Sequence, residues 1–157
     1  RDRDLPAPVE DPLMTIMSRH VARLLLAPTW MVALAVMIKG YADTGDGFSA
    51  GIIASLGVLL QYLVVGTRET TQLLPVRYAR EAAQFGLLIA LLVTFIPVLW
   101  GDPILTHYPR PGESVTHLGT LELLTAVLFD VGVFLLVLGV ATGVIDLIAR
   151  SRERRPT

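Results

Sequence analysis

Four long apolar runs separated by short polar segments dominate the hydropathy pattern of this chain. Each run is about 20 residues long, the length that an α-helix needs to cross the hydrocarbon core of a bilayer. The predicted spans cover about residues 21–39, 47–67, 82–101 and 122–148. The fold class is therefore expected to be all-α, a polytopic membrane protein with four transmembrane helices. The segments between the runs are too short to enclose cores of their own, so residues 1–157 are expected to form a single membrane domain.

A shorter amphipathic segment precedes the first span. Asp11 and Pro12 are typical of a helix N-cap followed by the first helical position. The apolar residues after them recur at helical spacing and are Leu13, Ile16, Met17, Val21 and Leu24. Because the opposite side carries arginines, this short N-terminal extension is expected to lie along the membrane interface before the chain turns inward.

Composition and charge agree with this pattern and add an orientation. Hydrophobic residues make up 53% of the 157 residues and the mean hydropathy is +0.60, which is too apolar for a water-soluble domain. All but two of the 13 lysines and arginines precede the first run, separate the second from the third, or follow the fourth; the exceptions are Lys39 and Arg110. The positive-inside rule therefore puts both termini in the cytoplasm, which predicts a multi-pass protein of the cell membrane. Basic residues beside a membrane favour contact with membrane lipid and do not imply nucleic acid binding.

The apolar run from Leu123 to Ile145 contains one carboxylate, Asp130. An acid at the centre of a spanning helix costs about 2.5–3.5 kcal/mol on insertion scales, so an interaction must offset it. Two interpretations stay open: Asp130 is a step in a cation or proton path, or it makes a structural bond to a neighbouring helix. Glu122, at the outer end of the same predicted helix, is either a favourable acid in the first turn or a collector for cations.

Three glycines of the same run, Gly132, Gly139 and Gly143, lie roughly opposite Asp130 around the helix. Glycines at such spacing allow another helix to approach closely. A helix that presents an acid on one side and glycines on the other favours protein contacts over lipid on both sides. Four helices can hardly supply all of these contacts, so other membrane subunits are expected as partners.

The first loop after a span is rich in glycine and acids. The residues that define this loop motif are Gly40, Asp43, Gly45, Asp46, Gly47 and Phe48. The loop lacks the alternating oxygen ligands and distal glutamate of an EF-hand, so a tight turn is expected and calcium binding is not.

The sequence also contains few residues in patterns typical of a zinc site or of a catalytic site. His107 and His117 stand ten residues apart in a proline-broken loop, so a zinc site is not expected. The chain has no cysteine, no HExxH motif and no serine–histidine pair within a span. The sequence therefore predicts neither an enzyme nor a bound cofactor.

Two sequence elements resemble the B subunit of Mrp-type multisubunit sodium/proton antiporters, the MnhB family. The first is the loop at residues 40–48, GYADTGDGF, which keeps the glycines and final phenylalanine of the family's turn but has Tyr41, Thr44 and Asp46 where histidine, proline and glycine are usual. The second pairs GDPILT at residues 101–106 with LFDVGVF at residues 128–134, and Asp130 falls on the family's aspartate.

The resemblance implies a small subunit of a large membrane complex that exchanges sodium for protons and is related to the membrane arm of respiratory complex I. In that setting Asp130 would either supply a carboxylate to a hydrated ion path or fix the contact with a neighbouring subunit. The alternative is a purely structural membrane subunit of a respiratory or hydrogenase-type complex. Neighbouring genes would distinguish the two.

Overall fold

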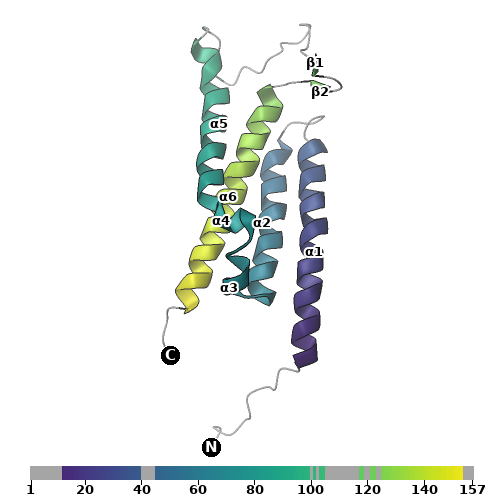
Figure 1. Cartoon of the computed structure of the whole chain (residues 1–157). Helices are drawn as coiled ribbons and strands as arrows, with labels where there is room; N and C mark the ends of the chain where they lie inside the picture. Colours follow the sequence, from purple (N-terminus) through teal and green to yellow (C-terminus); the bar gives the residue numbers. More distant parts are fainter. Residues whose placement is uncertain are drawn as a thin grey trace, which may run out of the picture.

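The computed structural model describes residues 12–39, 45–99, 101, 103–104, 117–118, 121–122 and 125–153. Among these residues, four helices are long and apolar enough to cross a membrane: α1 (Pro12–Lys39), α2 (Asp46–Val64), α5 (Ala79–Leu99) and α6 (Thr125–Glu153). Between α2 and α5 lie two single-turn helices, α3 (Thr67–Thr70) and α4 (Leu74–Arg77). The strands β1 (His117–Leu118) and β2 (Leu121–Glu122) pair antiparallel, with His117 opposite Glu122 (Figure 1). The predicted all-α class with four membrane-length helices is confirmed.

The helix boundaries depart from the hydropathy runs by a few residues. The predicted N-terminal extension and first span are one continuous helix, α1, and α6 continues through polar residues to Glu153. Glu122 belongs to β2, before α6 begins, so its expected place in the first turn of the fourth helix is wrong. Hydropathy follows which side chains suit lipid, whereas a helix extends as far as its backbone hydrogen bonds do.

Two helices end earlier than predicted because glycines break them. Gly66 follows α2 with φ 97° and Gly101 follows α5 with φ 82°, in the left-handed region that other residues rarely adopt. The backbone therefore leaves the helix at these points although the apolar run continues up to them.

The four long helices stand in a row rather than in a closed bundle. α2 packs between α1 and α6, α6 packs between α2 and α5, and α1 makes only marginal contact with α6 (Figure 1). The first residue of α1 and the last residue of α6 lie at the same end of the four helix axes, because the four long helices run alternately up and down. We call this the basic end, because Arg68 and Arg77 lie in the segment that connects α2 to α5 there and Arg80 lies in the first turn of α5. Its location in the cytoplasm stays a prediction.

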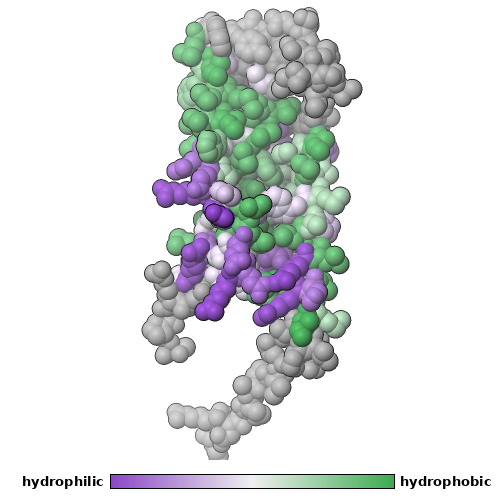
Figure 2. Space-filling model, viewed as in Figure 1, coloured by the Kyte–Doolittle hydropathy of each residue, from purple (hydrophilic) through white to green (hydrophobic). Residues whose placement is uncertain are grey.

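Small residues form the contacts between helices, while large apolar residues point outward. Ala33 of α1 and Ala54 of α2 are almost completely buried. Leu24, Leu63 and Leu99 are each more than 70% exposed, and apolar side chains cover much of the surface above the basic end (Figure 2). This arrangement suits a bilayer, where close backbone approach stabilises helix pairs and leucine is compatible with lipid.

The antiparallel pair α5 and α6 shows how close this approach is. A Cβ atom built on Gly86 of α5 would lie 2.4 Å from the backbone nitrogen of Leu136 and 2.5 Å from the backbone oxygen of Gly132. A Cβ atom on Gly139 of α6 would lie 2.4 Å from the backbone oxygen of Ala79. The two backbones touch at these points, so only glycine fits there.

Candidate functional site

Asp130 lies near the start of α6 and is only 5% exposed. Its carboxylate oxygen Oδ2 accepts a hydrogen bond from the backbone nitrogen of Gly45, at 2.9 Å. Gly45 immediately precedes α2 and has φ 117°, and it has no side chain with which to cap the helix. A carboxylate is favourable at this position because the first N–H groups of a helix lack intrahelical partners and carry partial positive charge.

Gly47 tightens the same junction. A Cβ atom at Gly47 would lie 2.2 Å from the backbone oxygen of Asp130, so the first turn of α2 rests directly on the backbone of α6. Gly45 and Gly47 thus form one site with Asp130, which lies 85 residues after Gly45 in the chain. The sequence identified all three but could not show that they meet.

The other residues of the loop motif either lie around this junction or fall outside the described residues. Asp46 forms an ion pair with Lys39 of α1 at 3.3 Å, which ties the two ends of the loop together. Phe48 is 58% exposed. Gly40 and Asp43 lie outside the described residues, as does the side chain of Glu122.

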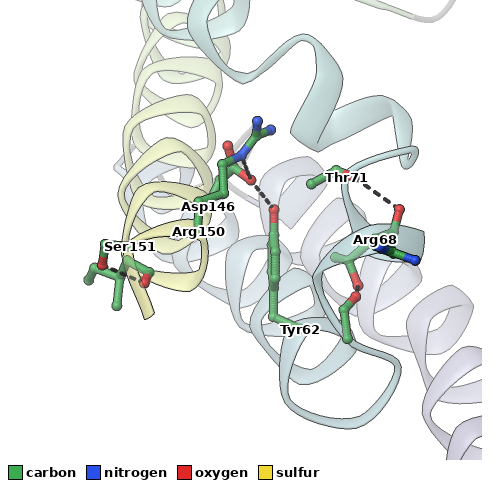
Figure 3. A network of polar contacts seen from close by, with 9 residues as sticks. Tyr62, Arg68, Thr71, Asp146, Arg150 and Ser151 are labelled. Atoms are coloured by element: carbon green, nitrogen blue, oxygen red, sulfur yellow. Dashed lines mark hydrogen bonds and ion pairs between the residues drawn. The ribbon is translucent and has the colours of Figure 1, made fainter. Parts of the chain in front are cut away.

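A second polar cluster joins α2 to α6 toward the basic end (Figure 3). The hydroxyl of Tyr62 donates a hydrogen bond to Oδ1 of Asp146 at 2.6 Å, and Nε of Arg150 donates to the same oxygen at 2.9 Å. The pair of Asp146 and Arg150 at i, i+4 follows from sequence spacing. The sequence analysis did not predict the hydrogen bond of Tyr62. The sequence signal for it is a tyrosine inside a predicted span, because a buried tyrosine hydroxyl needs a hydrogen-bond partner.

Buried polar groups also tie α1 to the row. Nε2 of Gln61 donates to the backbone oxygen of Ala22 at 2.6 Å, in a buried contact. The side chain of Trp30 packs against two clusters of buried residues that α2 shares with its neighbours. Its Nε1 and the hydroxyl of Thr142 have no hydrogen-bond partner among the described residues. The bond of Gln61 and the packing of Trp30 therefore fix how α1 lies against α2.

The three glycines of α6 have different surroundings. Gly132 lies against Gly86 and Ala90 of α5, and Gly139 lies against Ala79 and Ala83. No atom of the described residues lies within 4 Å of a Cβ built on Gly143. Gly132 and Gly139 therefore contact a helix of the same chain, while no described residue packs against Gly143.

Among the described residues, no three His, Asp or Glu side chains lie close enough together to hold a metal ion. The chemistry available at the Asp130 junction and at the Tyr62 cluster is hydrogen bonding and ion pairing. Both sites join α2 to α6.

Residues 17–143 match a family model described as a domain related to the MnhB subunit of Na+/H+ antiporter. The B subunit of the Na(+)/H(+) antiporter of Alkalihalophilus pseudofirmus is 34% identical over 141 residues, covering 90% of this chain and 94% of that protein. The corresponding B subunit of Bacillus subtilis is 34% identical over 116 residues, covering 74% of this chain and 80% of that protein.

A longer relative and a solved structure extend these matches. The A/B subunit of a probable K(+)/H(+) antiporter of Rhizobium meliloti is 34% identical over 136 residues, and the match covers 87% of this chain and 13% of that protein. A chain in the structure of the Mrp complex from Dietzia sp. DQ12-45-1b superimposes with a TM-score of 0.69 at 26% identity, covering 98% of this chain and 17% of that one. The resemblance found in the sequence is confirmed, and the chain belongs to the MnhB family of Na+/H+ antiporter subunit domains.

Proposed function

We propose that this protein is a small membrane subunit of a multisubunit cation/proton antiporter in the cell membrane, where it assembles with other membrane subunits. The family match over residues 17–143 carries this proposal, because two relatives of similar length are named as the B subunit of a Na(+)/H(+) antiporter. We take sodium as the exchanged cation on the strength of those names. The name of the Rhizobium relative includes potassium, so the test measures both ions.

The arrangement of the helices supports a role within a larger assembly. In the described part of the chain, only the short helices α3 and α4 pack onto the row of four long helices, toward the basic end, and the rest of its broad faces carries no further layer. Exposed apolar residues on all four long helices can contact lipid or the helices of neighbouring subunits. A subunit of this shape is well suited to lie between larger membrane proteins.

Asp130 has a positioning role in this proposal. Its carboxylate caps α2 from a different helix and so holds the start of α2 against α6. A hydrogen bond to a charged group contributes about 1.5–3 kcal/mol, which is comparable with the cost of placing an acid in a spanning helix. The bond to Gly45 therefore offers a reason for Asp130 that does not require it to release a proton.

The proposed function predicts co-purification and ion exchange. Affinity purification through a tag on this chain, in mild detergent, should recover several other membrane subunits. Everted vesicles from cells that carry the complex should show sodium-dependent proton exchange that disappears when the gene for this chain is deleted. Recovery of the chain alone, or unchanged exchange with sodium and potassium after deletion, would contradict the proposal.

Substitution of Asp130 tests its role separately. Asp130→Ala leaves the N–H of Gly45 without its acceptor and should reduce recovery of the complex, whereas Asp130→Asn keeps an acceptor oxygen and should retain most recovery and exchange. Asp46→Asn is the matched control, because it removes an acid in the first turn of α2 whose ion pair with Lys39 is partly exposed. A fully assembled Asp130→Asn complex without exchange would refute the positioning role and place the carboxylate on the ion path.

A further inference from the structure

A pocket of about 380 Å³ opens between α2 and α6 toward the basic end. Residues from both helices and from the start of α3 line it. They are Leu59, Tyr62, Leu63, Thr67, Ile145, Ile148, Ala149 and Arg152. Neither the Asp130 junction nor the family match assigns a role to this pocket.

The lining changes from apolar to polar along the helices. Leu59 and Ile145 lie farther along the helices from the basic end, while Thr67 and Arg152 lie at the basic end. From Ile145 to Arg152 the distance along α6 is about 10 Å at 1.5 Å per residue. An apolar channel with a cation at its interfacial end matches a phospholipid, whose acyl chain adjoins an anionic phosphate.

Access to the pocket is from the lipid side. Leu63 is 74% exposed and Ile148 is 52% exposed, so both present apolar surface to the surroundings of the row. Arg152 is also exposed, and no other described side chain forms an ion pair with it. Arg150 is held by Asp146, which leaves Arg152 as the cation that lines the pocket.

We propose that this pocket binds an anionic phospholipid, with one acyl chain between α2 and α6 and the phosphate at Arg152. Charge complementarity at Arg152 and the change from apolar to polar lining favour lipid over an apolar helix of another subunit. Basic pockets between spanning helices on the cytoplasmic side commonly hold anionic lipid headgroups. The bound lipid would fill the space between the two helices next to the cluster of Tyr62 and Asp146 and so stabilise their contact.

The test uses the complex purified through this chain and placed in nanodiscs. The probe is phosphatidylglycerol that carries a photoactivatable diazirine on its acyl chain, and peptide mass spectrometry locates the adducts on this chain. We expect adducts at Leu63 and Ile148 in excess of those at Leu87 and Leu88, which are also exposed, on α5. The phosphatidylcholine analogue with the same chain should label these positions severalfold less.

Variants at the headgroup position separate recognition from general contact with lipid. Arg152→Gln should lower labelling at Leu63 about fivefold, which corresponds to the loss of one basic residue at a membrane surface. Arg152→Lys should retain labelling, and Arg80→Gln, at another exposed arginine of the basic end, should leave it unchanged. Equal labelling of α2 and α5, equal labelling by the two lipids, or no effect of Arg152→Gln would overturn the proposal. Absence of any adduct at Leu63 and Ile148 would also overturn it, because a bound acyl chain must lie beside both side chains.

Discussion

Replacement of Gly139 by alanine should weaken the pair α5 and α6, whereas the same change at Gly143, one turn later, should not. The Cβ atom added at Gly139 would lie 2.4 Å from the backbone oxygen of Ala79 and 2.5 Å from the backbone nitrogen of Ala83. Ordinary van der Waals contact begins near 3.4 Å, so the two helices must separate by about 1 Å. Backbone atoms on both sides of the contact cannot rotate away as a side chain would.

The expected free energies follow from these distances. Overpacking a close contact costs about 1–3 kcal/mol, and a backbone contact belongs at the upper end of that range. Alanine is more favourable than glycine in a helix interior by about 1 kcal/mol, so Gly139→Ala should have a net cost of about 2 kcal/mol. Gly143→Ala meets no described atom within 4 Å and should be neutral or stabilising by up to about 1 kcal/mol.

The assay compares the two variants in the assembled complex. A fluorescent tag on this chain allows size-exclusion chromatography after heating, which gives the temperature at which the chain leaves the complex. Gly139→Ala should lower that temperature and Gly143→Ala should not. Equal behaviour of the two variants would show that the separation between α5 and α6 does not depend on Gly139, and the reasoning from backbone contact would fail.

Two further predictions concern the polar cluster and the orientation of the chain. Tyr62→Phe removes the hydroxyl that binds Asp146 and should destabilise the contact of α2 with α6 by about 0.6–1.7 kcal/mol, measured in the same heating assay; an unchanged transition would show that this hydrogen bond contributes nothing. Because the native chain has no cysteine, single cysteines at Asp43 and Arg110 should react with a membrane-impermeant label on intact cells, whereas one at Arg77 should not. The reverse pattern of labelling would invert the predicted topology.

The sequence alone determined the class of this protein and the side chains worth attention. Runs of about 20 apolar residues leave few alternatives to spanning helices, since in lipid the backbone must satisfy its own hydrogen bonds. The cost of a charge in such a run singled out Asp130 in the same way. The glycine pattern of the loop and the LFDVGVF segment also sufficed to indicate the family that the comparisons confirmed.

Which of these residues meet was decided only by the tertiary structure. The carboxylate of Asp130 lies on α6 and the N–H that it binds lies 85 residues earlier, and no local pattern encodes that contact. Gly139 and Gly143 are equivalent in the sequence, yet of the two only Gly139 faces another helix in the described part of the chain. Helical periodicity gives the angle of a residue around its own axis, whereas the position of the neighbouring helix depends on how all four pack. For the same reason the hydrogen bond of Tyr62 to Asp146, between two separate spans, became apparent only in the tertiary structure.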